Sequence, residues 1–511
     1  MLNKFVRLIG VCGFMLAAVG CSSKKDLFEP VESPEIINHF DVGSQWSRST
    51  QGANGKYSQL APCIYGDKLY VAGRAGKVYA FDAATGNSVW TKDLDDEEEN
   101  DNKRSARLNG GVTASSTYVA VGSENGYVYV LNRSDGNVFF KYYIGAEILS
   151  APAFSADDSK LFVLDANGAL HALDLASKER LWISGGAMET LHLRSQSRPL
   201  AIADDLVIVG TPSGKVLMIS QQDGVIINQI VVGQNNGSAA LDRISDVSST
   251  PLLLGDNMYT TAYNAGFVNY NFKENAVTAR LAYHSSKDLA FDDNYFILTG
   301  DNGHIYCVRR KDNVEVWENS SLTYRNVSAP AIYGNLVVVG DYEGYVYFLD
   351  LENGNILTKI EVSSSPIYVA PLVYGSNLIV YSSSGTIESL HYDPVGLVAS
   401  KQAYIEAEHS AGTSAALMAA KNIAPLNQGV VTKEALEKRR AEARQLVARI
   451  DAQQRRMEAE YREYQRRKAE YERRVKEYEK EKRERLSGYG LMVGEGVKSN
   501  SKSEFVEEGS E

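Results

Sequence analysis

The residue types that most often do chemistry are scattered along this 511-residue chain rather than clustered. The seven histidines stand at positions 39, 171, 192, 284, 304, 391 and 409, without the close spacing of a zinc motif. The chain contains neither a Gly-x-Ser-x-Gly nucleophile turn nor a Gly-x4-Gly-Lys-Ser/Thr phosphate loop. We therefore expect no catalytic residue, no metal site and no enzymatic activity.

The four cysteines do not support redox or nucleophilic chemistry either. Cys12, Cys21, Cys63 and Cys307 include no adjacent pair and no Cys-x-x-Cys, which excludes a disulfide framework. Cys63 and Cys307 fall in apolar segments and are expected to be small core residues. The acidic run at 93–101 lacks the glycine-punctuated order of a calcium loop, so we interpret it as a solvated insertion.

The N-terminus has the organisation of an export signal. Lys4 and Arg7 precede an apolar run at 8–19, and small residues lead to Cys21, which predicts a signal peptide over 1–20. The segment resembles a bacterial lipoprotein signal, which implies that Cys21 carries acyl chains such as palmitate and anchors the protein to a bilayer. Ser22 then implies sorting to the outer membrane, with the protein facing the periplasm. The alternative is ordinary cleaved export with Cys21 a free thiol.

Composition and charge limit the remaining classes. Hydrophobic residues make up 44% of the chain and aromatic residues 10%, as in a globular protein. The formal net charge of -11 argues against a nucleic-acid partner bound through a basic field. Residues 21–40 are polar and contain proline, so we expect a flexible tether there.

An internal repeat is the strongest signal in the sequence. Eight segments pair an alternating apolar strand with a glycine turn, and the turn glycines are Gly76, Gly126, Gly168, Gly214, Gly266, Gly303, Gly344 and Gly385. Their spacing of 37 to 52 residues is typical of a β-propeller blade. The repeat predicts an all-β, eight-bladed β-propeller of four-stranded antiparallel blades over 41–395.

The tryptophans indicate how the ring closes. Trp90, Trp182 and Trp317 fall at matching points of a fourth strand, where we expect them to pack between blades. Trp46 precedes the first repeat, and the eighth repeat has no tryptophan of its own. We therefore expect the strand around Trp46 to complete the last blade, which removes the exposed edges of an open ring.

The repeat LYVAGRAGKVYAFDAATGNSVW resembles the blade motif of pyrroloquinoline-quinone (PQQ) enzymes. Together with the lipoprotein-like signal, the stretch LHLR at 191–194 and the stretch LDRISDVSSTP at 241–251, the chain resembles the BamB family over about residues 38–395. The resemblance implies a non-enzymatic scaffold lipoprotein of the outer-membrane β-barrel assembly (BAM) complex, without a cofactor. It implies as partners the POTRA domain of BamA, the other assembly lipoproteins and unfolded outer-membrane proteins.

The same resemblance implies a set of partner-binding residues. The positions that match the family's BamA contacts are Leu191, Leu193, Arg194 and Asp246. Two positions depart from the family pattern, because His192 separates the leucines and Ser248 replaces a second acidic residue. From the residues alone, loop packing is the favoured role of the leucines, and Asp246 also fits a turn or a strand cap.

Two alternative functions, from other classes of protein, remain open. One is a PQQ-type quinoprotein dehydrogenase with an atypical site, although the adjacent cysteine pair that such enzymes place over the cofactor is absent. The other is an envelope interaction protein that acts mainly through its C-terminal segment.

That segment has no counterpart in the family. A linker is expected at 396–431, a charged helix at 432–485 and a disordered tail at 486–511. Apolar residues recur every seven positions from Leu436 to Tyr478, but the second seam position is only partly filled, so any coiled coil is weak. Glu-to-Lys/Arg pairs four residues apart favour a solitary solvated helix. Dimerisation, docking on another envelope protein and contact with anionic lipid or cell wall remain alternatives.

Overall fold

The structure is a computed structural model that describes residues 28–53, 58–94, 105–186, 192–194, 196–202, 205–233 and 243–398, together with residues 466, 470, 473, 474 and 477. The chain divides into two units, Met1–Asp393 and Pro394–Glu511. The predicted signal peptide, Cys21, the segment 399–465 and the tail at 486–511 lie outside the described residues.

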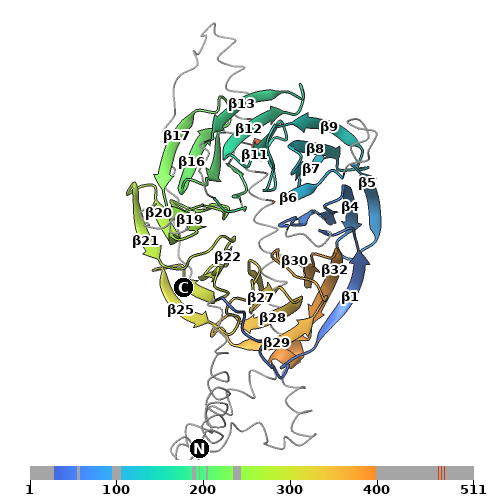
Figure 1. Ribbon diagram of the computed structural model, residues 1–511, viewed down its shortest axis with the longest axis vertical. Coiled ribbons are helices and arrows are strands. Elements are labelled where there is room, and N and C mark those ends of the chain that lie inside the picture. Colours follow the sequence, from blue (N-terminus) through green and yellow to red (C-terminus); the bar gives the residue numbers. More distant parts are fainter. Residues whose placement is uncertain are drawn as a thin grey trace, which may run out of the picture. The chain divides into compact units, whose positions relative to one another are not determined.

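The first unit is a ring of eight four-stranded antiparallel sheets, or blades (Figure 1). Within each blade the strands are given from the inner to the outer one. Blade 1 comprises β2 (Cys63–Tyr65), β3 (Lys68–Ala72), β4 (Lys77–Asp82) and β5 (Ser88–Asp93). Blade 2 comprises β6 (Leu108–Ala114), β7 (Tyr118–Ser123), β8 (Tyr127–Asn132) and β9 (Val138–Tyr143). Blade 3 comprises β10 (Ala153–Phe154), β11 (Lys160–Leu164), β12 (Ala169–Asp174) and β13 (Arg180–Gly185). Blade 4 comprises β14 (Leu200–Ile202), β15 (Leu206–Gly210), β16 (Lys215–Ser220) and β17 (Ile226–Val231).

The second half of the ring repeats this plan. Blade 5 comprises β18 (Leu252–Leu254), β19 (Asn257–Ala262), β20 (Gly266–Asn271) and β21 (Ala276–Leu281). Blade 6 comprises β22 (Ala290–Phe291), β23 (Tyr295–Thr299), β24 (Ile305–Arg309) and β25 (Val314–Asn319). Blade 7 comprises β26 (Ala331–Tyr333), β27 (Leu336–Gly340), β28 (Tyr345–Asp350) and β29 (Ile356–Glu361). Blade 8 comprises β30 (Leu372–Tyr374), β31 (Asn377–Tyr381), β32 (Thr386–Tyr392) and β1 (Val42–Ser49).

Blade 8 closes the ring with strands from both ends of the propeller sequence. In Figure 1, β1 (blue) lies beside β32 (orange), and the two strands pair antiparallel with Gly43 opposite His391 and Ser47 opposite Glu388. This arrangement confirms the predicted eight-bladed propeller and the predicted closure by the strand around Trp46. Because β1 pairs with the outer edge of β32, the first strand of the ring covers an edge that blade 8 would otherwise expose.

The core lies between neighbouring blades rather than inside one sheet. The second strand of each blade is buried on both faces, and β27 (sequence LVVVG) is buried throughout its length. One cluster joins Tyr70 and Trp90 of blade 1 to Val121 of blade 2. Side chains that alternate between the two faces of each small sheet therefore pack against both neighbours, as the period-2 pattern predicts.

The tryptophans pack on glycines of the next blade. Trp90 Nε1 donates a 2.9 Å hydrogen bond to the carbonyl oxygen of Arg133, and a Cβ on Gly136 would lie 2.5 Å from the Trp90 ring. Gly136 has a φ of 73°, a backbone conformation that glycine adopts without strain. Its lack of a side chain also leaves room for the Trp90 ring. The equivalent pairs are Trp46 with Gly86, Trp182 with Gly224 and Trp317 with Gly354.

Residues 28–40, here called the N-terminal strap, are fastened to the ring. The expectation of a flexible tether over 21–40 was wrong for these residues. Val31 N–H donates to the carbonyl oxygen of Thr323 at 3.1 Å, and Arg325 Nη1 donates back to the carbonyl oxygen of Val31 at 2.8 Å. Further along, His39 N–H donates to the carbonyl oxygen of Leu357 at 2.9 Å. These backbone bonds order a polar stretch whose composition alone suggests a linker.

The second unit is described at few positions. Residues 394–398 are helical, as are residues 466, 470, 473, 474 and 477. Arg473 Nε lies 3.9 Å from Glu477 Oε1, an exposed pair four residues apart. The rest of the charged helix expected at 432–485 lies outside the described residues, so its extent and any coiled coil remain predictions. Within the described parts, no helix has the length and apolar character needed to span a bilayer.

Candidate partner-binding site

The two stretches that the sequence singled out lie on the same face of the ring. Successive strands in a blade are antiparallel, so the turn between second and third strands and the connection to the next blade share one end of the sheet. Leu193 and Arg194 lie in the connection from β13 to β14, and Asp246 lies in the connection from β17 to β18. Leu191, the remaining predicted contact residue, lies outside the described residues.

Asp246 fastens the Leu193 segment to the propeller. The backbone N–H of Leu193 donates a 2.7 Å hydrogen bond to Asp246 Oδ2. The Asp246 backbone is held in turn, because Tyr263 N–H donates to its carbonyl oxygen at 3.0 Å. Asp246 is only 1% exposed, so its carboxylate positions the neighbouring loop from inside the protein rather than presenting a charge to solvent.

Arg194 belongs to a group of three arginines around one carboxylate, here called the arginine cluster. Glu124 Oε2 accepts from Arg74 Nη2 at 2.5 Å and from Arg107 Nη2 at 2.7 Å. Arg194 Nη2 lies 3.0 Å from the other carboxylate oxygen, Oε1. The Glu124 side chain is 2% exposed, so the cluster has a buried anion at its centre.

The electrostatics of the cluster keep Glu124 ionised. Burial opposes ionisation, but the guanidinium groups of Arg74, Arg107 and Arg194 outweigh it and hold the pKa of Glu124 below its ordinary value. Asn109 Nδ2 also donates to Glu124 Oε1 at 3.0 Å, which further satisfies the buried oxygen. Charge-assisted hydrogen bonds of this kind are roughly twice as strong as neutral ones.

Arg194 is the member of the cluster that reaches solvent most. Its side chain is 51% exposed, and its Nη1 lies 3.1 Å from Glu147 Oε2. Glu147 is itself partly exposed, so this second pair is open to competition from an incoming carboxylate. An ordered, half-exposed guanidinium beside the leucine of a fastened loop has the composition of an interface hot spot.

Of the two departures from the family pattern, His192 is partly exposed and Ser248 is buried. His192 Nδ1 lies 2.8 Å from the carbonyl oxygen of Leu193, within its own loop. Ser248 is 94% buried, with a relative exposure of 6%. The exposed electrostatic character of this face therefore comes from the arginine cluster and not from position 248.

Sequence reasoning did not single out Glu124, Arg74 or Arg107. Glu124 is 50 residues from Arg74 and 17 from Arg107. The β3–β4 turn that carries Arg74 and the β7–β8 turn that carries Glu124 meet only because blades 1 and 2 are neighbours. The available signal was the position two residues before the turn glycine, which is Arg74 in the first repeat and Glu124 in the second, so opposite charges occupy equivalent turns of neighbouring repeats.

The other candidate reactive groups are structural. Burial raises the pKa of the Cys63 thiol to about 12 and that of Cys307 to about 12, which leaves both as thiols at neutral pH. His171 Nε2 lies 3.0 Å from Asp165 Oδ2 inside blade 3. Among the described residues, no three His, Cys, Asp or Glu side chains are grouped as a metal site would require.

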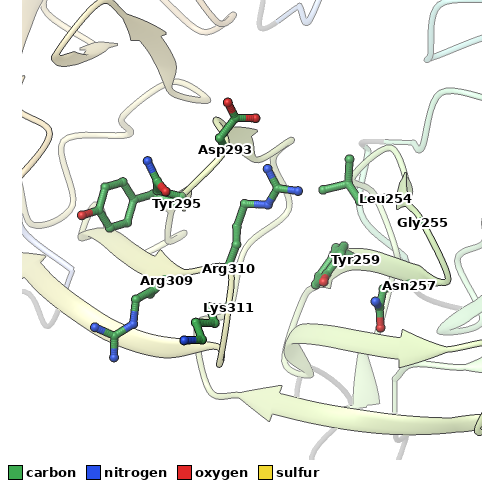
Figure 2. Close-up of a pocket in the computed structure, with 10 residues that line it drawn as sticks. Leu254, Gly255, Asn257, Tyr259, Asp293, Tyr295, Arg309, Arg310 and Lys311 are labelled. Carbon is green, nitrogen blue, oxygen red and sulfur yellow. The ribbon is translucent and has the colours of Figure 1, made fainter. Parts of the chain in front are cut away.

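A hollow of about 630 Å³ lies on the opposite face, between blades 5 and 6 (Figure 2). Figure 2 shows the Arg310 side chain extending from blade 6 toward Asp293. Two of the three cations that line it have contacts of their own: Arg309 Nε lies 2.9 Å from Asp312 Oδ1, and Arg310 donates to the carbonyl oxygen of Asp292.

The fold and this site together define a β-propeller of PQQ-like repeats whose distinguishing feature is the face that carries the arginine cluster. A model of the family described as "Outer membrane protein assembly factor BamB" matches residues 37–104 and 74–319. The outer membrane protein assembly factor BamB of Yersinia pestis is 32% identical over 385 residues, which cover 74% of this chain and 97% of that protein. The protein of the same name from Escherichia coli K12 is 31% identical over 375 residues, covering 73% of this chain and 95% of that protein. The chain belongs to the BamB family.

Solved structures agree on the fold. The crystal structure of BamB from Moraxella catarrhalis superposes with a TM-score of 0.61 at 19% identity, covering 69% of this chain and all of that one. A quinohemoprotein alcohol dehydrogenase from Comamonas testosteroni reaches 0.52 at 12% identity, covering 69% of this chain and 77% of that one, and shares only the propeller architecture. The curated relatives are named as assembly factors and not as enzymes, which confirms the prediction that the chain is not an enzyme.

Proposed function

We propose that this protein is a scaffold of the outer-membrane β-barrel assembly complex and that it binds the POTRA region of BamA through the face that carries Leu193 and Arg194. Membership of the BamB family supports the assembly role. The observation that carries the binding site is the bond from Leu193 N–H to Asp246 Oδ2, which joins the two family stretches into one surface.

The parts of this surface have separate tasks. Asp246 holds the loop in place before a partner arrives, which reduces the entropy lost on binding. Leu193 and Leu191, two positions before it in sequence, supply apolar anchors, and Arg194 supplies a charge-assisted hydrogen bond to a carboxylate of the partner. Asp246 is thus a positioning residue, whereas Leu193 and Arg194 touch the partner.

The same proposal places the propeller on the periplasmic face of the outer membrane, attached through acyl chains on Cys21. The other lipoproteins of the assembly complex and unfolded outer-membrane proteins are its further partners. The signal-like sequence at 1–20 supports the anchor. Changing Cys21 to Ser should move the protein from the membrane fraction of an envelope preparation to the soluble fraction. A membrane fraction that retains the Cys21→Ser protein in full would contradict the anchor.

Capture from the native envelope tests the partner and the surface together. The full chain is solubilised in detergent and captured as wild type, as Leu193→Ala/Arg194→Ala and as the control Lys273→Ala, and the co-purifying proteins are identified by mass spectrometry. Lys273 is an exposed cation paired with Asp256 in blade 5, so its removal tests for a general charge effect.

We expect BamA with the wild type and the control but not with the double variant. Glu124 keeps Arg74 and Arg107 when Arg194 is removed, so the ring should stay folded. Equal recovery of BamA by the double variant would refute the surface, and its absence from every sample would refute the assembly role.

A further inference from the structure

The outer strands of the eight blades form the rim of the ring, and one of them lacks the usual protection of an exposed sheet edge (Figure 1). Edge strands are normally guarded by charged side chains, which discourage pairing with other chains. Seven of the outer strands, β1, β5, β9, β13, β21, β25 and β29, each contain at least one Lys, Arg, Asp or Glu. The eighth, β17, has the sequence IINQIV and contains none.

The same strand exposes more apolar surface than the other outer strands. Val225, Ile226, Ile227 and Val231 are between 42% and 59% exposed. None of the other seven outer strands has more than two exposed large apolar side chains. Single exposed apolar residues are ordinary on a protein surface, but a group of them along one sheet edge indicates an interaction site.

The backbone of β17 also presents hydrogen-bonding groups to the outside of its sheet. Residues of an antiparallel strand alternate between bonding to the neighbouring strand and pointing away from it. Val232 N–H donates to the carbonyl oxygen of Gly214 at 2.9 Å, and the next residue pair is Val231 with Lys215. This register turns the backbone groups of Val231 and Gln229 outward, where no described residue forms a backbone bond to them.

Blade 7 shows that such an edge accepts another segment of chain. Lys359 of β29 is equivalent to Gln229, because each pairs with the residue three positions after the turn glycine. Both outward groups of Lys359 bond to the side chain of Asn38 in the N-terminal strap, at 2.9 Å from its N–H to Oδ1 and at 3.1 Å from Nδ2 to its carbonyl oxygen. On the same edge, His39 N–H donates to the carbonyl oxygen of Leu357 at 2.9 Å.

The β17 edge is continuous with the surface proposed for BamA. The connection that carries Leu193 leads into blade 4, and β17 leads out of blade 4 into the connection that carries Asp246. A partner assembled on that surface therefore lies beside an unguarded strand.

We propose that the outer edge of β17 binds an extended segment of a partner protein as a fifth strand of blade 4. The segment bonds to the outward backbone groups of Gln229 and Val231, and its apolar side chains cover the exposed isoleucines and valines of the edge. An uncharged strand with alternating apolar and polar side chains fits this edge, and strands of outer-membrane barrels have that alternation. The inference rests on the proposed function for its partner, an unfolded barrel protein, and adds the place and the mode of binding.

Fluorescence anisotropy on the full chain in detergent tests the edge with a labelled peptide of sequence KTVTVTVTVK, which alternates valine with threonine. In the control peptide KTVTPTVTVK, a proline removes one backbone donor and opposes strand pairing. In the control KTETETETEK, glutamate replaces the apolar side chains. We expect the first peptide to bind and each control to bind about tenfold more weakly or less.

Variants assign the binding to β17. Gln229→Pro removes an outward N–H without removing a bond to β16, and Val231→Lys supplies the missing guard charge. Each should weaken binding of the alternating peptide about tenfold or more. The matched controls lie in blade 5, where Ala279→Pro is at the position equivalent to Gln229 and Val277→Lys adds charge to a strand that already contains Arg280. Neither control should change the affinity.

The outcomes that contradict the proposal are distinct. Failure of the wild type to bind the alternating peptide, or equal affinity in Gln229→Pro, Val231→Lys and the wild type, would overturn the site. Analytical ultracentrifugation gives a further check. A wild type that sediments as a dimer, becomes a monomer in Val231→Lys and does not bind the peptide would assign the edge to a second copy of the chain.

BamA capture separates this inference from the proposed function. Gln229→Pro should lose the peptide and still capture BamA, whereas Leu193→Ala/Arg194→Ala should lose BamA and bind the peptide with wild-type affinity. Loss of BamA in Gln229→Pro would assign the edge to BamA itself and overturn the barrel-strand partner. Absence of BamA from every sample would refute the assembly role, and the peptide measurements would still decide whether the edge accepts a strand.

Discussion

The backbone N–H of Leu193 donates to the buried carboxylate of Asp246 at 2.7 Å, across 53 residues of sequence. Two residues that the family resemblance implies as contacts of the same partner are thus bonded to each other. A buried acceptor that holds a loop is expensive to lose, because the loop amide is left unsatisfied. Asp246 should therefore act on partner binding through the order of the loop.

Replacing Asp246 tests this positioning role. Asp246→Ala should reduce the free energy of unfolding by about 1–3 kcal/mol and weaken BamA capture, because the Leu193 amide loses its acceptor. Asp246→Asn keeps an acceptor oxygen and should be the milder change. Hydrogen exchange at the Leu193 amide, alongside capture, measures the effect. A loss of capture in Asp246→Asn equal to that in Asp246→Ala, with slow exchange at Leu193 in both, would instead indicate direct contact of the carboxylate with the partner.

The arginine cluster predicts a defined pH dependence. The folded-state pKa of Glu124 lies below its ordinary value of 4.5, so the ionised carboxylate stabilises the fold. That contribution is complete above about pH 4.5 and is lost as the pH falls through the lowered folded-state pKa. Glu124→Gln should cost about 1–3 kcal/mol at pH 7, measured by urea unfolding, and this difference should shrink in acid.

Exposed Glu361 provides the matched control for the cluster. Glu361→Gln should change the urea midpoint little at either pH. A destabilisation by Glu124→Gln that is the same at pH 7 and at pH 3 would mean that side-chain packing, and not the carboxylate charge, holds the cluster together.

The tryptophan contacts predict which turn glycines tolerate a side chain. Gly136 and Gly66 both have positive φ, 73° and 62°, but only Gly136 faces a tryptophan ring. Gly66→Ala should cost about 1–2 kcal/mol from backbone strain. Gly136→Ala should cost about 1–3 kcal/mol more, because its methyl group displaces Trp90. Thermal unfolding of the two variants gives the comparison, and equal losses of stability would show that the Trp90 contact is easily rearranged.

Arg325 joins the N-terminal strap to the ring, and its removal should release the strap. Its side chain is 1% exposed and binds Asp341 Oδ2 through Nη2 at 2.7 Å, Glu343, and the carbonyl oxygen of Val31 at 2.8 Å. Arg325→Ala should destabilise the fold by about 3–5 kcal/mol, because Asp341 is left buried without its cation. It should also expose the strap to protease.

Arg309→Ala is the control for the strap, since Arg309 forms an exposed ion pair with Asp312. Such a pair contributes about 0–1 kcal/mol, so this variant should resemble the wild type. A strap that resists protease equally in the Arg325→Ala and Arg309→Ala proteins would show that the backbone bonds to Thr323 and Leu357 suffice.

The architecture of the ring could be predicted from the sequence because the patterns that indicate a blade are local and repeated. The turn glycine and the alternating strand that follows it occur within every repeat, so eight copies reinforce each other, and the outer-strand tryptophan adds a further signal in the repeats of Trp90, Trp182 and Trp317. Ring closure could be predicted because the eighth repeat has no tryptophan, whereas Trp46 lies before the first repeat and belongs to none. The structure places Trp46 in the outer strand of blade 8.

The site could be predicted only in part, because its contacts join different blades. The partner residues came from a family resemblance, and nothing local indicated that Asp246 is buried or that Glu124 gathers three arginines. The strap was misjudged for a related reason. Polar residues with proline resemble a linker in composition, and the buried Arg325 that fastens them lies 294 residues from Val31.

Closure by β1 also affects how the chain must be made. Ser47 and Ile387 are neighbours in blade 8 although 340 residues separate them. The first strand of the ring, β1, therefore cannot pair until β32 has been synthesised. A chain stopped before β32 would present β1 and β31 as open edges, which favour pairing with other molecules. Contacts of such high sequence separation slow folding. The ring can therefore close only after the last strand of the propeller has been synthesised. A cell that makes this protein must therefore keep an almost complete propeller from aggregating until its final strand has been synthesised.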